Sequence, residues 1–440
     1  MSFKRILGGI LCASMVMSMA FTSCSNNQGS SSVESSSSRG ESSILSEGES
    51  SMGEAVTLQV IVDADAMGIM EPATQILEEN TGIKSEIITQ SYDQTYNKIM
   101  TSVMGGAPID VIICDSPWTA EFASKGILLC IDDYISDELK NDFFPAYLDQ
   151  VSYEGKLYAM PQTAQAKWLY YNKDMLAEAG YDNPPATWDE LFEMGDKMVE
   201  MGLCKYDIAW AAVQAEGLVC DWLVVTEVSG SHLRDDAGNW TFNNEDTARG
   251  LSLIVDSIAD GRADPGSINY TDREVLNPFM AGDIPFVLNW SFAYAMAKDP
   301  ETSQITDSVA VGLVPSNKEG VTSATATGSG GYGIAATSEH PDEAYQLLET
   351  VNSKECIMIT GETGSNPPPI MSIYEDEDFK EKYPMFVDFY PQLQYGVARP
   401  ALTGYSEWSN KMQLGLHEAM IGAKDVETVL NELAEQSAAY

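Results

Sequence analysis

A carboxylate, a hydroxyl and a large indole appear together where a buried strand is expected to end. Val111–Cys114 is a short apolar run, typical of a strand that is covered on both faces. The next four residues are Asp115, Ser116, Pro117 and Trp118. Carboxylates accept hydrogen bonds from hydroxyls and indoles cover apolar surfaces, so this group could hold a small hydroxylated molecule. The alternative is structural: Asp115 caps the next helix and Trp118 packs in a core.

Six tryptophans lie outside clear helix-core positions or at the ends of elements, where an indole could face a ligand. An indole can cover the apolar face of a ring-shaped ligand whose rim carries hydroxyls, and burying about 100 Å² of apolar area contributes roughly 2.5 kcal/mol. The entropy lost on binding cancels much of that gain, so several rings and hydrogen bonds are needed. Core packing is the alternative for each indole. The six are Trp118, Trp168, Trp210, Trp222, Trp290 and Trp408.

Short apolar runs alternate with amphipathic segments after residue 55. This pattern predicts an α/β fold with a mostly parallel sheet, and ligands bind beyond the carboxyl ends of such strands. Asp65 and Asp115 follow two of these strands, and Thr187 with Glu190 predicts a capping box at the start of a helix. The expected strands are 56–63, 84–88, 111–114, 127–131, 168–172 and 309–315, and the expected helices are 70–80, 92–104, 119–125 and 188–201.

Composition and motifs exclude several classes of function. The chain has 440 residues and a formal net charge of -42 at pH 7, which argues against nucleic acid because phosphates need a basic surface. The sequence has no phosphate loop, no G-x-S-x-G motif and no metal-ligand cluster, so we expect no enzymatic activity, no cofactor and no metal. The alternative to this expectation is an enzyme, a glycoside hydrolase, because 66 acidic residues could supply a catalytic carboxylate pair.

The cysteines do not form a disulfide pattern. Five of the seven lie beyond residue 24, and this odd number with wide spacing predicts buried free thiols. The alternative is that two of the five form a single disulfide. These five are Cys114, Cys130, Cys204, Cys220 and Cys356.

The first residues have the features of a targeting segment. Lys4 and Arg5 precede an apolar stretch, and small residues then lead to Cys24. We expect a lipoprotein signal peptide at 1–23, with Cys24 lipidated as the mature N-terminus. An ordinary secretory signal that is cleaved near Ser23 is the alternative. Residues 24–55 are rich in Ser, Gly and Glu, which predicts a disordered tether.

Nine short segments and a longer closing one occur in an order that resembles a known family. They are Asn80–Ile83, Gly106–Val111, Asp115–Trp118, Gly126–Leu129, Gly155–Pro161, Tyr170–Asp174, Pro185–Leu191, Phe279–Gly282, Gly330–Ala335 and the closing Arg399–Gln436. Over about residues 56 to 436, this order resembles the extracellular solute-binding proteins of ABC importers, the large sugar-binding family that includes the maltose binders.

The resemblance implies a two-lobed periplasmic-binding-protein-like fold of type II, with mostly parallel sheets, helices on both faces and three hinge crossings. The crossings are expected near Gln162–Gln165, Val309–Leu313 and Asn366–Pro369. The N-terminal lobe would then comprise residues 56–163 and 312–366, and the C-terminal lobe residues 164–311 and 367–440. The family traps its ligand by closing the lobes around it.

Matching positions also imply ligand contacts. For Trp290 and Tyr332 the alternative is packing inside a lobe, and for Arg399 it is an ion pair on the surface or between lobes. The residues implied by the resemblance are Asp115, Trp290, Gly331, Tyr332, Arg399 and Trp408. The candidates that rest on local chemistry alone are Asp65, Trp118, Trp168, Trp210, Asp221 and Trp222.

The implied function is that of a receptor on the extracellular face of the cell membrane, or on the periplasmic side where an outer membrane exists. A monomer anchored by lipid would capture a sugar or oligosaccharide and deliver it to ABC permease subunits that are driven by a cytoplasmic ATPase. Two alternatives remain open. One is a receptor for a polyamine or a cationic peptide, and the other is a surface sensor or adhesin that kept the fold without a permease.

Overall fold

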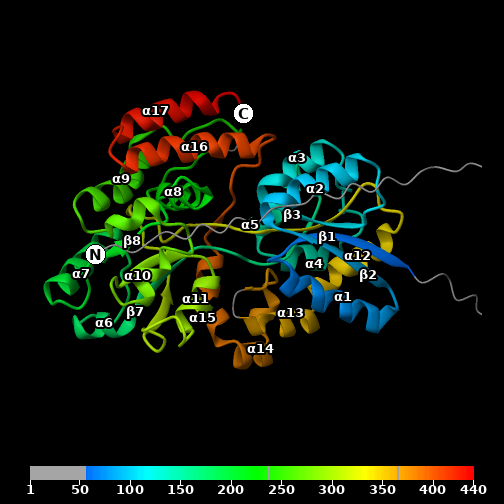
Figure 1. The fold of residues 1–440 in the computed structure, drawn as a ribbon, viewed down its shortest axis with the longest axis horizontal. Helices are drawn as coiled ribbons and strands as arrows, with labels where there is room; N and C mark the ends of the chain where they lie inside the picture. The colour runs from blue at the N-terminus through cyan, green and yellow to red at the C-terminus, as the bar shows by residue number, and fades with distance from the viewer. Residues whose placement is uncertain (1–55, 236, 364–365) are drawn as a thin grey trace, which may run out of the picture. The chain divides into compact units, whose positions relative to one another are not determined.

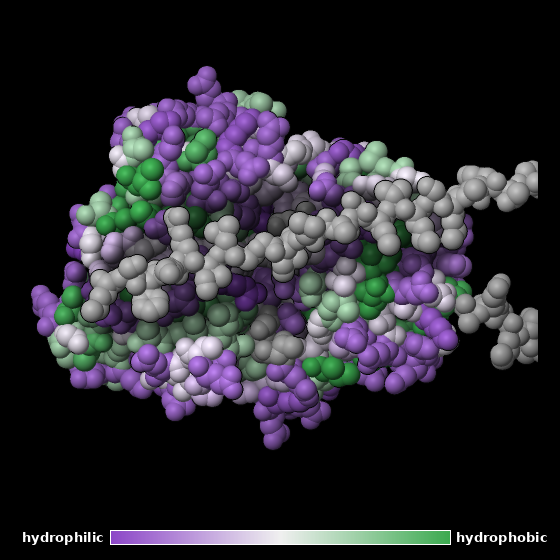
Figure 2. Space-filling view, viewed as in Figure 1, coloured by the Kyte–Doolittle hydropathy of each residue, from purple (hydrophilic) through white to green (hydrophobic). Residues whose placement is uncertain are grey.

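The computed structural model describes residues 56–235, 237–363 and 366–440 (Figure 1). The expected signal peptide, Cys24 and the tether lie outside the described residues. Within the described part, no helix is both long and apolar enough to cross a bilayer. On the face shown in Figure 2, hydrophilic residues cover much of the surface, as the net charge of -42 leads one to expect.

The part of the fold that we call the first lobe is built on a five-stranded sheet. Its strands are β1 (Thr57–Asp63), β2 (Lys84–Gln90), β3 (Val111–Asp115), β6 (Met160–Pro161) and β12 (Gly330–Ile334). Their order is β2-β1-β3-β12-β6, in which β1 pairs in parallel with β2 and β3. β12 runs antiparallel between β3 and β6. The carboxyl ends of β1 and β3 therefore meet at one edge of this sheet.

Helices cover both faces of the first sheet. The main ones are α1 (Met67–Thr81), α2 (Tyr92–Met104), α3 (Thr119–Ser124), α12 (Pro341–Val351) and α13 (Lys354–Thr360). α2 and α3 lie on one side of the sheet, and α1 and α12 on the other (Figure 1). The smaller elements are η1 (Ser116–Trp118), α4 (Asp137–Asp142), α5 (Pro145–Asp149), β4 (Ser152–Tyr153), β5 (Lys156–Leu157), η3 (Gly361–Thr363), η4 (Ser372–Glu375) and α14 (Glu377–Lys382).

The second lobe is built on a four-stranded sheet. Its strands are β7 (Trp168–Asn172), β8 (Ile208–Ala209), β9 (Phe286–Asn289) and β10 (Val309–Gly312). Their order is β10-β7-β9-β8, and only the β8–β9 pair is parallel. The expectation of mostly parallel sheets is therefore wrong for this lobe, because β7 pairs antiparallel with both of its neighbours.

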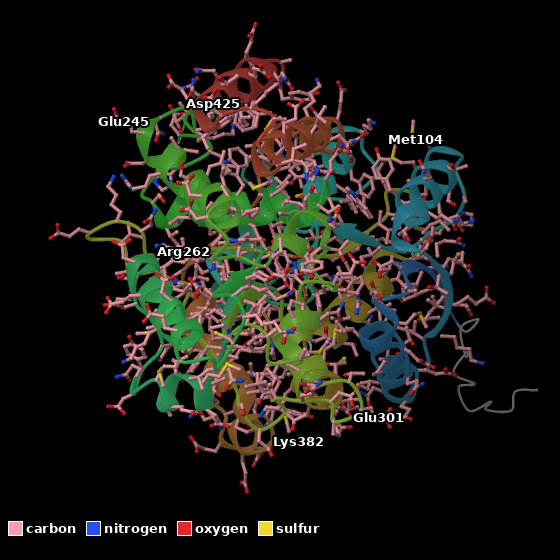
Figure 3. All side chains as sticks on the ribbon, turned by 60° about the vertical axis from the view of Figure 1, so that its left-hand side comes forward. Met104, Glu245, Arg262, Glu301, Lys382 and Asp425 are labelled. Atoms are coloured by element: carbon pink, nitrogen blue, oxygen red, sulfur yellow. The ribbon has the colours of Figure 1, made fainter. Side chains whose placement is uncertain are left out.

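The helices of the second lobe pack around α8 (Glu216–Val228), whose thirteen residues are nearly all buried. α8 contacts α9 (Glu245–Ala259) and α16 (Tyr405–Met420), and α16 contacts α17 (Val426–Ser437). The other elements are α6 (Lys173–Glu178), α7 (Trp188–Glu200), η2 (Pro265–Asn269), α10 (Leu276–Met280), α11 (Phe292–Lys298) and α15 (Pro384–Leu393). The side chains of Glu245, Lys382 and Asp425 lie at the periphery, as does the exposed Met104 (Figure 3).

Two segments that connect the lobes run side by side. The first follows β6, and the second begins with the short strand β11 (Thr325–Ala326), which pairs with β13 (Gly396–Val397). Ala166 and Thr327 form an antiparallel bridge, and the backbone N–H of Gly328 donates to the carbonyl of Gln165 at 2.8 Å.

The second crossing expected at Val309–Leu313 is wrong. Val309–Gly312 is β10, an edge strand of the second sheet, so the chain stays in the second lobe until β11. The expected boundary between the lobes at 366–367 also differs from the observed course of the chain. Pro367 accepts a hydrogen bond from Ala164 beside the first crossing, but Ile370 still bridges to Phe143 of the first lobe.

Most expected elements are present. α2 and β7 have the bounds that their sequence patterns predict, and Thr187 caps α7 by accepting the N–H of Glu190 at 3.2 Å. The run at 127–131 is not a strand; Leu128 forms an isolated bridge to Ala335. All five cysteines in the described part are free, with three buried, Cys204 half-buried and Cys130 exposed.

Candidate ligand-binding cleft

A cleft of about 900 Å³ lies where the first lobe, the crossing segments and the second lobe meet. The carboxyl ends of β1 and β3 contribute one wall, and the start of α8 with the residues before α10 and after β9 contributes the other. Five carboxylates and two guanidinium groups are among its described lining residues.

Carboxylates dominate the wall formed by the first lobe. Asp63 and Asp115 are the last residues of β1 and β3, which are neighbouring parallel strands, and Asp65 lies just after β1. The Asp63 carboxylate accepts the backbone N–H of Ala66 at 2.9 Å and so starts the turn into α1. Burial raises the pKa of Asp63, and the negative charges of Asp65 and Asp115 add to the rise. This wall can accept hydrogen bonds from several hydroxyl groups.

Trp290 and Phe292 supply the aromatic surface of the second-lobe wall. Trp290 is half-buried at the end of β9, and its indole Nε1–H donates to Oδ1 of Asp272 at 3.2 Å. The ring packs against the second crossing segment, because a Cβ atom on Gly328 would lie 2.7 Å from its Cζ3. The indole is therefore held on one side while it lines the cleft on the other.

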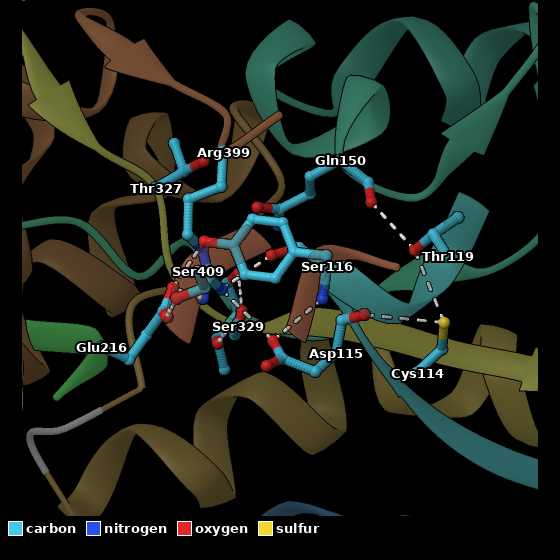
Figure 4. A network of polar contacts seen from close by, with 12 residues as sticks. Cys114, Asp115, Ser116, Thr119, Gln150, Glu216, Thr327, Ser329, Arg399 and Ser409 are labelled. Carbon is cyan, nitrogen blue, oxygen red and sulfur yellow. Dashed lines mark hydrogen bonds and ion pairs between the residues drawn. The ribbon is translucent and has the colours of Figure 1, made fainter. Parts of the chain in front are cut away.

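Arg399 joins the two walls (Figure 4). Its Nη2 donates to Oγ of Ser116 at 2.8 Å and lies 3.4 Å from Oδ1 of Asp115, and its Nη1 donates to Oε1 of Glu216 at 3.0 Å. Burial alone would lower the pKa of Arg399, but the carboxylates of Asp115 and Glu216 outweigh it and raise the pKa above its ordinary value. Arg399 is therefore a permanent cation that bridges the first lobe to the start of α8.

Glu216 has its own supporting contacts. Its Oε1 also accepts from the hydroxyl of Tyr405 at 2.5 Å, and its Oε2 accepts from the hydroxyl of Ser409. Both partners lie on α16, so α8 and α16 fix the carboxylate that Arg399 binds. A carboxylate held in this way gives the guanidinium a defined orientation.

Four of the predicted site residues line the cleft: Asp65, Asp115, Trp290 and Arg399. Asp115 combines both of its sequence-based roles. Its Oδ1 accepts the N–H of Ser116 at 2.8 Å, which caps η1, and the residue also lines the cleft beside Arg399.

Three predicted residues lie inside the first lobe and do not line the cleft. Trp118 is 6% exposed and packs against Tyr96 and Phe122. Gly331 is buried in β12, where a Cβ atom would lie 2.2 Å from the carbonyl oxygen of Met160. Tyr332 is 1% exposed in the same strand. Sheet and core packing account for all three, which corrects the expectation of ligand contacts.

Four predicted tryptophans are likewise core residues. Trp168 stacks on Phe389 and donates to its carbonyl, and Trp210 stacks on Trp188. Trp222 contacts Phe242 edge-on, and Trp408 stacks on Trp240. Each is at most 1% exposed and none lines the cleft. The expectation of ligand contacts is therefore corrected for Trp168, Trp210, Trp222 and Trp408.

Several lining residues were not among the predictions. Gln162 and Gln165 were expected only as a hinge, yet both line the cleft, and Ser291 donates to Oε1 of Gln165 at 2.6 Å. Glu216, Asp272 and Arg273 carried no usable signal, because charged residues at a helix start or in a loop are common in an acidic chain. Phe292 could have been found, since it lies two residues after Trp290.

Comparison with known proteins identifies the family. The sequence profile described as bacterial extracellular solute-binding protein matches residues 55–355. The chain belongs to this family. The solute-binding protein is 31% identical over 310 residues to the probable ABC transporter-binding protein of Deinococcus radiodurans, which covers 68% of this chain and 72% of that relative. The family resemblance expected from the sequence is thus confirmed.

Solved structures confirm the two-lobed fold of the solute-binding protein. Maltose-bound MalE3 of T. maritima superposes with a TM-score of 0.75 at 25% identity, over 87% of this chain and 99% of that one. A solute-binding protein of Thermotoga lettingae bound with α-D-tagatose gives a TM-score of 0.73 at 22% identity, over 87% and 98%. The family is one of extracellular transport proteins.

Proposed function

We propose that this solute-binding protein is the lipid-anchored receptor of an ABC importer and that it captures a small sugar or polyol in the cleft. It would deliver the ligand to membrane permease subunits and perform no bond chemistry itself. Cys24 would carry the lipid, which places the receptor on the extracellular face of the membrane.

The observation that carries the proposal is the pairing of an aromatic wall with fixed hydrogen-bonding groups. Trp290 can cover the apolar face of a sugar ring, while Asp272 and Arg399 lie at the same cleft to bind the hydroxyl rim. Gln165 adds an amide from the first crossing segment. Pockets of this kind combine a few aromatic surfaces with a few well-placed polar groups.

The lining also favours a short ligand. Trp290 and Phe292 are the only aromatic side chains among the described lining residues. Each can bury about 100 Å² of a ring face, which contributes roughly 2.5 kcal/mol. Two stacking surfaces match one or two sugar rings, and they leave the remaining affinity to hydrogen bonds. A long oligosaccharide would need the further indoles that the lobes instead use as cores.

A cationic ligand is the second candidate, because the cleft has more carboxylates than cations. Arg399 pairs with Asp115 and Glu216, but no ion pair joins Asp63 or Asp65 to a cation of the described residues. These two carboxylates could bind an ammonium group. A polyamine would need both of them, whereas a neutral sugar would use them as hydrogen-bond acceptors.

Calorimetry on the purified residues 25–440 tests the proposal. Maltose, tagatose, ribitol, longer maltooligosaccharides, spermidine and a basic peptide form the panel. We expect micromolar binding for a neutral ligand of one or two rings or for a polyol, and no release of cleaved product. Binding of spermidine with no response to any sugar would contradict the proposal, as would turnover of a glycan. Membrane fractionation tests the anchor, since Cys24→Ala should release the full chain from the membrane.

A further inference from the structure

Lys167 is a fully buried lysine behind the second-lobe wall. Its side chain is 0% exposed, and its ammonium group pairs with Oδ1 of Asp221 and with Oδ1 of Asp272, the latter at 2.9 Å. A buried ammonium is stable only where carboxylates compensate for its lost hydration. Asp221 is itself 1% exposed beneath the cleft, so it serves this ion pair and is not among the lining residues.

Asp272 links this buried charge to the aromatic wall. The same atom, Oδ1, accepts from Nζ of Lys167 and from the indole Nε1–H of Trp290 at 3.2 Å. The ammonium also lies 5.2 Å from the centroid of the Trp290 ring, within the range of a cation–π contact. Trp290 therefore has two links to Lys167, one through Asp272 and one through its ring.

The backbone of Lys167 is tied to the second crossing segment. The backbone N–H of Lys167 donates to Oγ1 of Thr325 at 2.9 Å. The Thr325 hydroxyl donates in turn to the carbonyl oxygen of Lys167 at 2.7 Å. Thr325 belongs to β11. The lysine thus connects both crossing segments to a side chain of the cleft wall.

We propose that Lys167 is a positioning residue for ligand binding, which holds Asp272 and the Trp290 indole in the orientation that faces the cleft. Without its charge, Asp272 has no cation to hold its Oδ1 beside the indole N–H. The carboxylate then rotates toward solvent, because its side chain is 25% exposed. Trp290 loses its hydrogen-bond acceptor and its cation together, and its ring samples other rotamers. The effect on ligand affinity rests on the proposed function, whereas the effect on the indole does not.

Fluorine NMR tests the indole orientation without any ligand. The eight tryptophans are replaced by 5-fluorotryptophan, and Trp290→Phe assigns the resonance of Trp290. The double variant Lys167→Met/Asp221→Asn removes one charge of each sign, so the net charge of the site is unchanged while Asp272 loses its cation. We expect the Trp290 resonance to shift and broaden, while those of Trp118 and Trp240 stay in place.

The matched control is Lys205→Met/Asp283→Asn, an ion pair of the same lobe in which the lysine side chain is 66% exposed. This control should leave the Trp290 resonance unchanged. An unchanged Trp290 resonance in the folded Lys167→Met/Asp221→Asn protein would overturn the proposal, because the indole would then be oriented without the lysine.

A double-mutant cycle with maltose tests the consequence for binding. In the protein that keeps Trp290, Lys167→Met/Asp221→Asn should weaken maltose binding about tenfold. In the Trp290→Ala variant, the same double substitution should cause almost no further loss of affinity. Equal losses in both backgrounds would show that Lys167 does not act through Trp290. If the unmodified protein binds neither maltose nor any other sugar or polyol of the panel, the proposed function fails while the NMR result still decides the positioning role.

Discussion

Trp290 differs from the seven other tryptophans in what surrounds its ring. Trp210 is an enclosed indole: it is 1% exposed, stacks on Trp188 at 5.3 Å between centroids and donates to Oγ of Ser257, so its ring and its N–H are used inside the lobe. Trp290 also spends its N–H inside the protein, on Asp272, yet it is half-buried and lines the cleft. The remaining surface of this ring is available to a ligand.

Replacing Trp290 by alanine should therefore reduce affinity more than stability. We expect Trp290→Ala to weaken binding of the sugar identified in the panel by tenfold or more, because a stacking surface worth roughly 2.5 kcal/mol is lost. Calorimetry and thermal melting measure the two effects. The matched core variant Trp210→Phe should lower the melting temperature and leave affinity unchanged. The reverse pattern would assign Trp290 to the core.

Asp207 provides a pH test that is separate from the cleft. It is 1% exposed in the second lobe, and burial raises its pKa to about 7, with Asp196 adding to the rise and Arg262 opposing it. Between about pH 4 and pH 7 the folded protein holds a proton that the unfolded chain has released, so this group's contribution to stability falls as pH rises through that window.

Asp207→Asn removes this titration. The melting temperature of the variant minus that of the unmodified protein should increase when the pH is raised from 5 to 8. Thermal melting at both pH values measures the difference. If the melting-temperature difference between the variant and the unmodified protein is the same at pH 5 and pH 8, Asp207 titrates in the folded protein as it does in the unfolded chain.

At the scale of elements, the pairing of β3 with β12 leaves no room for a side chain at Gly330. A Cβ atom there would lie 1.9 Å from the carbonyl oxygen of Cys114. Gly330→Ala should therefore lower the free energy of unfolding by about 1–3 kcal/mol, the range for overpacked sites. Gly68 in α1 is the control, because nothing lies within 4 Å of its Cβ position.

Urea unfolding followed by circular dichroism measures both glycine variants. Gly68→Ala should equal or slightly exceed the unmodified protein, since alanine favours helix. A Gly330→Ala protein with unchanged stability would mean that β3 and β12 can separate at this position without cost.

The elements were more predictable than the site. α2 could be read from its helical periodicity and β7 from its short run of large apolar and aromatic residues, because both patterns are local. The apolar run at 309–315 predicts the strand β10, whereas the crossing expected at the same place came from the resemblance; a local pattern does not show which sheet a strand will join. The orientation of an indole depends on partners far away in the sequence, such as Phe389 for Trp168, and no local pattern contains that information. Asp115 could be found because it directly follows a predicted buried strand, and Trp290 because its position matches a stacking position of the family that the sequence resembles.

At the scale of the whole molecule, the buried guanidinium of Arg399 links the lobes through two ion pairs, in which Asp115 is largely buried and Glu216 is 37% exposed. The Arg399 side chain is 7% exposed and contacts Asp115 on one side and Glu216 on the other. Removing one member of a buried ion pair leaves the other charge uncompensated, which favours its return to water. Arg399→Gln should therefore favour a more open arrangement of the lobes.

Small-angle X-ray scattering measures this effect. Without sugar, Arg399→Gln should have a larger radius of gyration than the unmodified protein, and the sugar that binds should make the unmodified protein contract. Arg249→Gln is the control, because that arginine pairs with Asp246 on the surface of the second lobe. Equal radii for the Arg399 and Arg249 variants would show that Arg399 does not hold the lobes together.

The position of β12 has a consequence for the newly made chain. β3 ends at Asp115, but the strand that covers its other edge begins only at Gly330. Until β12 is in place, the edge of β3 offers unsatisfied backbone groups to any passing strand. Such distant pairing also slows folding. A chain that stops short of Gly330 should therefore aggregate, because this edge of β3 then stays unpaired.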